Sequence, residues 1–170
     1  MARVVLAQLR RGDADELVAF HRENQAFHAP WVSPFTEPEG FEPWFAQRVT
    51  GSHVTWLARE AATGAMVGVF NLGHIVLGPM CSAYLGYYGS ARLAGQGYMT
   101  EALRLVVRAG FYELGLHRIE ANIQPGNAPS IALARRAGFR KEGFSPRYLK
   151  IGGQWRDHER WAILADDDRE

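Results

Sequence analysis

Two glycines stand directly before a segment with helical periodicity in the stretch RLAGQGYMTEALRLVVRAGF, residues 92–111. The first amides of a helix have no partner within the helix, and the helix dipole favours an anion at that end. Because glycine has no Cβ, the backbone at Gly95 and Gly97 can approach an anion closely. The stretch therefore predicts a binding site for a phosphate or pyrophosphate group.

Two common phosphate-binding patterns do not fit this stretch. The dinucleotide fingerprint needs a third glycine where Thr100 stands, and an acidic residue at the end of a following parallel strand. The nucleotide P-loop needs a lysine directly after its last glycine, but Tyr98 follows Gly97. A plain strand-to-helix turn is the structural alternative, and it stays open on this stretch alone.

The cysteine and the histidines suggest no further chemistry. Cys81 is the single cysteine and stands in PMCSAYLGYY, without a histidine or acid at catalytic spacing, so we expect a small hydrophobic residue of the core. The six histidines show no metal-ligand spacing. We therefore expect no bound metal.

Composition narrows the class of protein. A net charge of +1 with scattered arginines argues against direct nucleic-acid binding. The first residues, MARVVLAQLRRGD, contain no apolar run long enough for a signal peptide, and no later stretch is long enough for a membrane span. We therefore expect a cytoplasmic protein without membrane contact.

The elements that must position the glycine loop follow from the hydrophobic pattern. Strands are expected at residues 3–10, 53–60, 65–75, 81–90 and 117–123, with two more within 139–164 around a Gly-Gly turn. Helices are expected at residues 13–24, 43–49, 98–114 and 128–138. Residues 28–45 carry four prolines and five aromatic residues and are expected to form an ordered loop that leads into the second helix. No repeat or linker divides the chain, so we predict one α/β domain over residues 1–170, with a mostly antiparallel sheet and one strand-helix-strand crossover.

Two helices carry more detailed expectations. We expect Asp13 to cap the first helix, whose buried face would consist of Leu17, Val18, Phe20 and His21. Gly115 should end the long helix after the glycine loop. The core face of that helix is expected to hold Ala102, Leu105, Val106, Ala109 and either Phe111 or Tyr112.

Two motifs together carry a resemblance to a known family. Arg92-Leu93-Ala94-Gly95-Gln96-Gly97 resembles the Arg/Gln-x-x-Gly-x-Gly/Ala loop of the GCN5-related N-acetyltransferases (GNAT). The second family signature, Asn-x-x-Ser/Ala-Ile-x-Leu-x-x-x-x-Gly-Phe, is matched one strand downstream by Asn127, Ser130, Ile131, Leu133, Gly138 and Phe139. The segments HAPWVSPF, ELGLHRIEANIQPGN and GGQWRDHERWAIL are similar to the RimJ/RimL branch, which acetylates protein N-termini. Relatives that acetylate antibiotics or small amines share these features.

The resemblance implies a fold and a cofactor. The fold would be an α+β domain with a mixed, mostly antiparallel sheet of six to seven strands, splayed at the central strands and flanked by about four helices. Acetyl-coenzyme A would bind with its pyrophosphate on the loop amides. Its pantetheine arm would lie against the strand at 81–90, where a bulge would leave an N–H free for the thioester carbonyl. The implied cofactor-binding residues are Leu85, Tyr87, Arg92, Gly95, Gln96, Gly97, Tyr98, Thr100, Asn127 and Ser130.

Catalytic roles are implied with one departure from the family pattern. Many small acetyltransferases carry a tyrosine seven positions after the motif asparagine to protonate the thiolate, and Ala134 stands there. In the RimL-like branch a serine at the position of Ser130 is the proposed acid, although Ser130 and Asn127 could also serve only as helix-start residues. Glu120 is the candidate general base, with a structural hydrogen bond as its alternative. Asp157 and Glu159 beside the acceptor groove, or a chain of waters, could take the same role.

The acceptor residues and the acceptor itself are the least determined. Trp31, Phe35, Trp44 and Tyr88 are candidates to bind the amine, although the aromatic residues of the loop could instead form a small core beneath it. The leading interpretation is acetyl transfer to the N-terminal amine of a protein. A small-molecule amine or antibiotic, and a sensor module that binds acetyl-coenzyme A without catalysis, are the alternatives. Both a monomer and a homodimer are compatible with the sequence.

Overall fold

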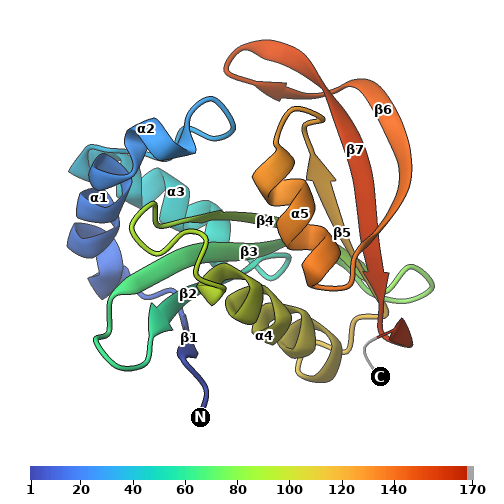
Figure 1. The fold of residues 1–170 in the computed structure, drawn as a ribbon, viewed down its shortest axis with the longest axis horizontal. Coiled ribbons are helices and arrows are strands. Elements are labelled where there is room, and N and C mark those ends of the chain that lie inside the picture. The colour runs from blue at the N-terminus through green and yellow to red at the C-terminus, as the bar shows by residue number, and fades with distance from the viewer. Residues whose placement is uncertain (168–170) are drawn as a thin grey trace.

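The computed structural model describes residues 1–167, and these form a single α/β domain around one mixed sheet (Figure 1). The sheet has the strand order β1-β2-β3-β4-β5-β7-β6. Its strands are β1 (Val4–Gln8), β2 (Val54–Glu60), β3 (Met66–Val76), β4 (Ser82–Gly89), β5 (Arg118–Ile123), β6 (Arg140–Ile151) and β7 (Gln154–Leu164). Every neighbouring pair is antiparallel except β4 and β5, which are parallel. This topology confirms the predicted crossover.

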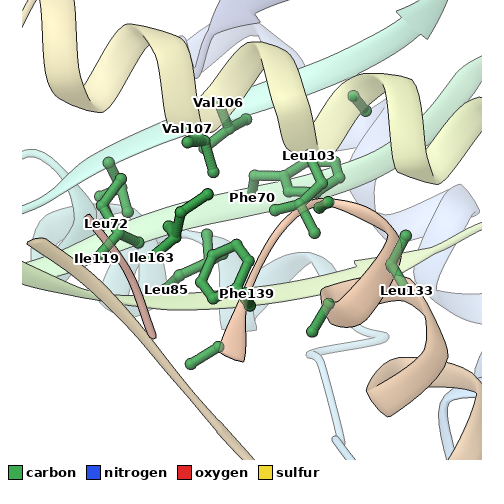
Figure 2. Close-up of a cluster of buried hydrophobic side chains, with 14 of the residues drawn as sticks. Phe70, Leu72, Leu85, Leu103, Val106, Val107, Ile119, Leu133, Phe139 and Ile163 are labelled. Atoms are coloured by element: carbon green, nitrogen blue, oxygen red, sulfur yellow. The ribbon is translucent and has the colours of Figure 1, made fainter. Parts of the chain in front are cut away.

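Helices cover both faces of the sheet. They are α1 (Ala14–Glu23), α2 (Gln25–His28), α3 (Phe41–Arg48), α4 (Tyr98–Tyr112) and α5 (Ala128–Arg136). The α4 and α5 helices pack on one face and form the main core with alternate residues of the strands, as Figure 2 shows for Phe70, Leu103 and Leu133. A second, smaller core joins α1 and α3 to the opposite face through residues such as Leu17, Phe41 and Leu57. The two cores place the sheet between two helical layers. No helix in residues 1–167 is long and apolar enough to cross a membrane.

Most of the expected helix faces are present, with three corrections. Leu17, Val18, Phe20 and His21 are buried as expected. The Asp13 carboxylate does not cap α1, because it accepts the N–H of Arg10 at 2.7 Å instead. In α4, Leu103 and Val107 are fully buried, which was not predicted, and Leu105 is only half-buried. Of the alternatives Phe111 and Tyr112, Phe111 is the buried one. The core face of α4 is therefore rotated relative to the predicted stripe.

Two predictions around β4 are wrong. Cys81 is not a core residue: it is half-exposed before the strand, with a positive φ of 43° and its thiol 3.0 Å from the Gly115 carbonyl. The bulge expected in β4 is also absent, since its register with β3 is continuous from Tyr84 to Gly89. The register shift lies at the other end of this pair, on β3 between Gly73 and Val76.

Candidate active site

The two central strands separate at one defined point. The parallel pairing of β4 with β5 runs from Ser82 opposite Arg118 to Leu85 opposite Ala121, and ends there. Beyond it β4 continues to Gly89 and β5 to Ile123 without pairing to each other. The predicted splay is therefore present, and it lies where the pairing of β4 with β5 ends.

A cavity of about 710 Å³ opens in this gap between β4 and β5. Leu85 and Tyr87 of β4, Asn127 and Ser130 of the α5 region, and Ile123 of β5 line it. The Trp31 ring closes one side, and a Cβ added to Gly126 would lie 3.4 Å from that ring. The cavity thus extends from the loop after α2, which carries Trp31, to the start of α5 across the unpaired ends of β4 and β5.

One end of the cavity has the chemistry of a phosphate site. Gly95 and Gly97 line it with positive φ angles of 73° and 85°. The α4 helix begins directly after Gly97, and no side chain of the described part of the chain caps its first amides. Beside it lies a depression of about 440 Å³ lined by Gly97, Thr100, Glu101, Leu105 and the arginines Arg3, Arg104 and Arg136. Free helix amides and guanidinium groups are the donors that bind phosphates. These residues therefore fit a pyrophosphate with additional phosphate charge.

Two side chains of the loop, Gln96 and Tyr98, are engaged by partners outside the cavity. The Gln96 amide nitrogen donates to the Arg92 carbonyl at 2.9 Å, which ties the loop to itself. The Tyr98 hydroxyl donates to Glu60 at 2.6 Å, and the Arg3 guanidinium lies over its ring. Arg92, Gln96 and Tyr98 are not among the residues that line the cavity, and their role in cofactor binding stays a prediction.

The start of α5 holds a hydroxyl pair against β4. Asn127 caps the helix through its Oδ1, which accepts the Ser130 amide at 3.3 Å, and it lines the cavity as well. The Ser130 hydroxyl lies 2.8 Å from the Tyr87 hydroxyl. Burial raises the pKa of Tyr87 to about 12, opposed by the hydrogen bond to Ser130, so its phenol is protonated at neutral pH. The pair can thus hold and pass a proton at the cavity wall.

A buried imidazole fixes the opposite wall. His21 Nδ1 lies 2.7 Å from the Phe35 carbonyl, which can only accept, so Nδ1 carries the proton. Its Nε2 therefore accepts from the Tyr88 hydroxyl at 2.8 Å. Desolvation lowers the pKa of His21 to about 4, and burial raises the pKa of Tyr88. Tyr88 lines the cavity, and a neutral histidine holds its hydroxyl in place.

The remaining acceptor candidates divide into two groups. Trp31 lines the cavity, as a residue that contacts the acceptor must. Phe35 and Trp44 do not: their rings pack at 5.3 Å against each other in the second core. The loop therefore serves as a small core at Phe35 and Trp44, and the expectation that these two bind the acceptor finds no support in the geometry.

Glu120 lies outside the cavity. It stands opposite Tyr84, where β4 and β5 are still paired, and does not line the opening. Its carboxylate accepts from Arg118 Nε at 2.7 Å, and the same guanidinium contacts Glu142. This matches the structural alternative stated for Glu120, and its proposed role as base has no geometric support.

The sequence patterns missed several residues of the site. Arg3, Arg104 and Arg136 come from three separate segments and meet only in the fold. Phe27 and His28 of α2 line the cavity, because the loop turns back over β4. His158 of β7 is buried and lines the cavity. In the sequence, only its position in the segment RDHER, on a predicted strand near the acceptor groove, pointed to a place in the site. Within residues 1–167, no group of three or more His, Cys, Asp and Glu side chains is arranged to hold a metal ion.

A splayed parallel pair, a glycine loop at a helix start and a nearby hydroxyl pair define a site of the kind used by acyltransferases that take acyl groups from coenzyme A. The chain belongs to the acetyltransferase (GNAT) family, whose domain model matches residues 3–140. Coenzyme A, as its acetyl thioester, is the cofactor of that family. The cavity between β4 and β5 and the phosphate site at its end fit this cofactor.

Named relatives place the chain within this family. It is 32% identical over 173 residues to the [ribosomal protein uS5]-alanine N-acetyltransferase of Escherichia coli, covering 97% of this chain and 89% of that protein. It is 43% identical over 110 residues to the probable N-acetyltransferase YjcK of Bacillus subtilis, where the match spans 65% of this chain and 61% of that protein.

Solved structures share the fold along the whole chain. Mycobacterium smegmatis RimJ in complex with CoA-disulfide has a TM-score of 0.88 at 30% identity, covering 98% of this chain and 84% of that one. Spermidine N-acetyltransferase from Vibrio cholerae, in complex with CoA and spermine, has a TM-score of 0.84 at 20% identity and full coverage of both chains. The second likeness concerns the fold alone.

Proposed function

We propose that this protein transfers an acetyl group from acetyl-coenzyme A to the N-terminal amine of a protein, of the ribosomal-protein type. One observation carries the choice of acceptor. Among residues 1–167, no aspartate or glutamate lines the cavity between the strands, and Arg136 at the phosphate end is the one permanently charged side chain in its lining. A polyamine carries several charges that a selective site would pair with carboxylates. A peptide terminus brings a single amine and a backbone that apolar and aromatic walls accommodate.

The family relationship supports the same acceptor class. The Escherichia coli relative, 32% identical over nearly the whole chain, is named for an alanine of ribosomal protein uS5. A cytoplasmic location is the matching expectation, since ribosomal proteins are made there. The identity to spermidine N-acetyltransferase is 20%, too low to argue for a polyamine.

The residues at the site take distinct parts in the proposed reaction. When bound, acetyl-coenzyme A supplies the acetyl group as a thioester. The backbone of Gly95 and Gly97, together with Arg136, would hold the phosphates of the cofactor. Leu85 and Asn127 would contact its pantetheine arm. The hydroxyl of Ser130, backed by the protonated phenol of Tyr87, would give a proton to the departing sulfur.

Two other functions have their own support. A hydrophobic small-molecule amine would fit the aromatic wall of Phe27, Trp31 and Tyr88. A sensor without catalysis is favoured by Ala134, which is fully buried where many small acetyltransferases carry a tyrosine. The hydroxyl pair of Ser130 and Tyr87 argues for catalysis, because a sensor has no need of a proton donor at the cavity wall.

The test is acetylation of a defined panel of amines. The purified chain would be incubated with acetyl-coenzyme A and one of three acceptors. The first is an alanine-initiated peptide, the second is the same peptide with a formylated N-terminus and an internal lysine, and the third is spermidine. Released thiol would be measured, and mass spectrometry would locate the acetyl group. We expect acetylation of the free α-amine and none of the blocked peptide. Acetylation of spermidine alone would replace the proposal by a small-amine enzyme, and binding without thiol release would favour a sensor.

A further inference from the structure

The two faces of the sheet carry different chemistry at the opening. Ile119, Ala121 and Ile123 of β5 belong to the core under α4 and α5, so Asn122 faces the opposite side. Tyr87 faces the α5 side too, because its hydroxyl contacts Ser130. The proton-donating hydroxyls therefore lie on the face covered by α4 and α5. An amine that enters from the opposite face has to lose its proton there.

His158 lies on that opposite face. Asn122 pairs with Arg160 across β5 and β7, and paired residues share a face. His158 stands two residues before Arg160 on a strand without a register shift against β5, so it shares the same face. It is 3% exposed and lines the cavity. Its ring is thus at the opening, on the side away from Ser130.

The hydrogen bonds of His158 leave one nitrogen available. Its Nδ1 lies 2.9 Å from the Arg156 carbonyl. A carbonyl only accepts, so Nδ1 carries the hydrogen and the lone pair of the neutral ring is on Nε2. That nitrogen makes no hydrogen bond among residues 1–167. Arg156 and Arg160 share the strand face of the ring, and the ring centroid of Tyr148 of β6 is 6.3 Å away. His28 and Tyr88, from the other side of the opening, line the same cavity.

The neighbouring carboxylates are already engaged. Glu120 is held by Arg118 below the opening. Glu159 pairs with Ile123 and so lies on the α5 face, where Lys141 and the Trp161 indole donate to it at 3.0 and 2.9 Å. Asp157 accepts the Arg147 amide. None of the three lines the cavity.

The other cavity histidine is closed off. His28 Nε2 lies 2.8 Å from the Gly89 carbonyl and therefore donates, and its Nδ1 is fully buried without a partner among the described residues. Burial also lowers the pKa of His28. An amine cannot reach this nitrogen without moving the wall, so His28 is unsuited to accept its proton.

We propose that His158 is the general base that deprotonates the acceptor amine, an inference that rests on the proposed acetyltransferase function but not on the choice of acceptor. The proton leaves the acceptor ammonium and joins Nε2. The freed lone pair of the nitrogen forms the new C–N bond as the C–S bond of the thioester breaks. The sulfur then takes a proton from the hydroxyl pair of Ser130 and Tyr87. The acetylated nitrogen loses its second proton, which balances the one given by that pair and restores it through solvent, and the imidazolium releases the first proton to solvent.

The test compares His158→Gln with two matched variants. His117→Gln removes an exposed imidazole outside the cavity, and Glu120→Gln removes the rival base. Rates would be measured against pH with the alanine-initiated peptide, or with spermidine if that is the amine the parent acetylates. Calorimetry with acetyl-coenzyme A and a thermal unfolding midpoint for each variant would separate catalysis from cofactor binding and folding.

We expect His158→Gln to lower kcat/KM by about 100-fold, with loss of the rising acid limb of the pH profile. The affinity for acetyl-coenzyme A should stay within about twofold of the parent, because Nε2 accepts a proton from the amine and does not contact the cofactor in this proposal. His117→Gln should behave like the parent. A rate within about threefold of the parent with the acid limb kept, or the full loss in Glu120→Gln, would overturn the assignment. If spermidine alone is acetylated and its turnover depends on His158, this inference stands and the peptide proposal ends.

Discussion

Acidification should destabilise the protein through His21, the buried histidine that holds Tyr88 at the acceptor wall. Desolvation lowers the pKa of His21 from 6.5 to about 4 in the folded state. Above about pH 6.5 the ring is neutral in both states, and it contributes no pH dependence. As the pH falls further, the unfolded chain binds a proton that the folded chain does not, so stability falls and the loss is complete below about pH 4.

The magnitude follows from the two pKa values. When His21 is protonated in the unfolded state and neutral in the folded state, the free energy of unfolding falls by up to about 3 kcal/mol. Between about pH 7.5 and pH 5 the loss of unfolding free energy is about 2 kcal/mol. The assay is urea unfolding followed by tryptophan fluorescence at both pH values, for the parent and for His21→Gln. His117→Gln is the matched control, because its side chain is exposed.

The comparison isolates His21, since all other titrating groups are common to the variants. We expect the pH-dependent loss of unfolding free energy to be about 2 kcal/mol smaller in His21→Gln than in the parent, even if the variant is less stable at both pH values. The control should lose as much as the parent. Equal pH dependence in the parent and His21→Gln would refute the conclusion that the ring is neutral and desolvated beside Tyr88.

Three further changes test separate parts of the site. Asn127→Ala removes the cap of α5 and should lower the free energy of unfolding by about 1 kcal/mol in urea titrations; an unchanged value would contradict the cap. Gly97→Ala places a Cβ at a φ of 85° and should cost about 1 kcal/mol and weaken acetyl-coenzyme A in calorimetry, whereas Gly12→Ala should do neither. Arg136→Gln should weaken acetyl-coenzyme A roughly tenfold, and more at low salt than at high salt. Arg108→Gln, which removes a guanidinium that lies over Tyr112, is the charge-matched control, and an equal loss there would show a general charge effect.

Local patterns predicted the elements because each has a strong period. The alternation at Ile119, Ala121 and Ile123 and the glycines at 95 and 97 identified the strand and loop that frame the site. The splay itself was anticipated by family resemblance, and it begins where pairing ends at Leu85 and Ala121; the bulge expected in β4 is absent. Whether two strands stay paired depends on what packs between them, which no single segment encodes.

Side-chain partners were harder to predict because they join distant segments. Phe35 and Trp44 look like an aromatic rim in sequence but pack under the loop, since α3 folds back onto β2 and β3. The arginines that surround the phosphate end come from the N-terminus, α4 and α5. Glu120 was correctly placed on the polar face of its strand, yet Arg118 two residues away engages it. Such pairings depend on register and rotamer, which the hydrophobic period leaves open.

The central claim is that the loop at Gly95 and the cavity between β4 and β5 bind acetyl-coenzyme A. Titration calorimetry of the parent and of Gly95→Asp tests it most directly, because the substitution places a carboxylate where the pyrophosphate would lie. Any side chain is strained at the Gly95 φ of 73°, so Gly95→Asn, with the same strain and no charge, is the matched control; no atom of residues 1–167 lies within 4 Å of the new Cβ. We predict binding by the parent at about micromolar strength and its loss in the variant. Absence of binding by the parent, or equal binding by a folded Gly95→Asp variant, would contradict the account.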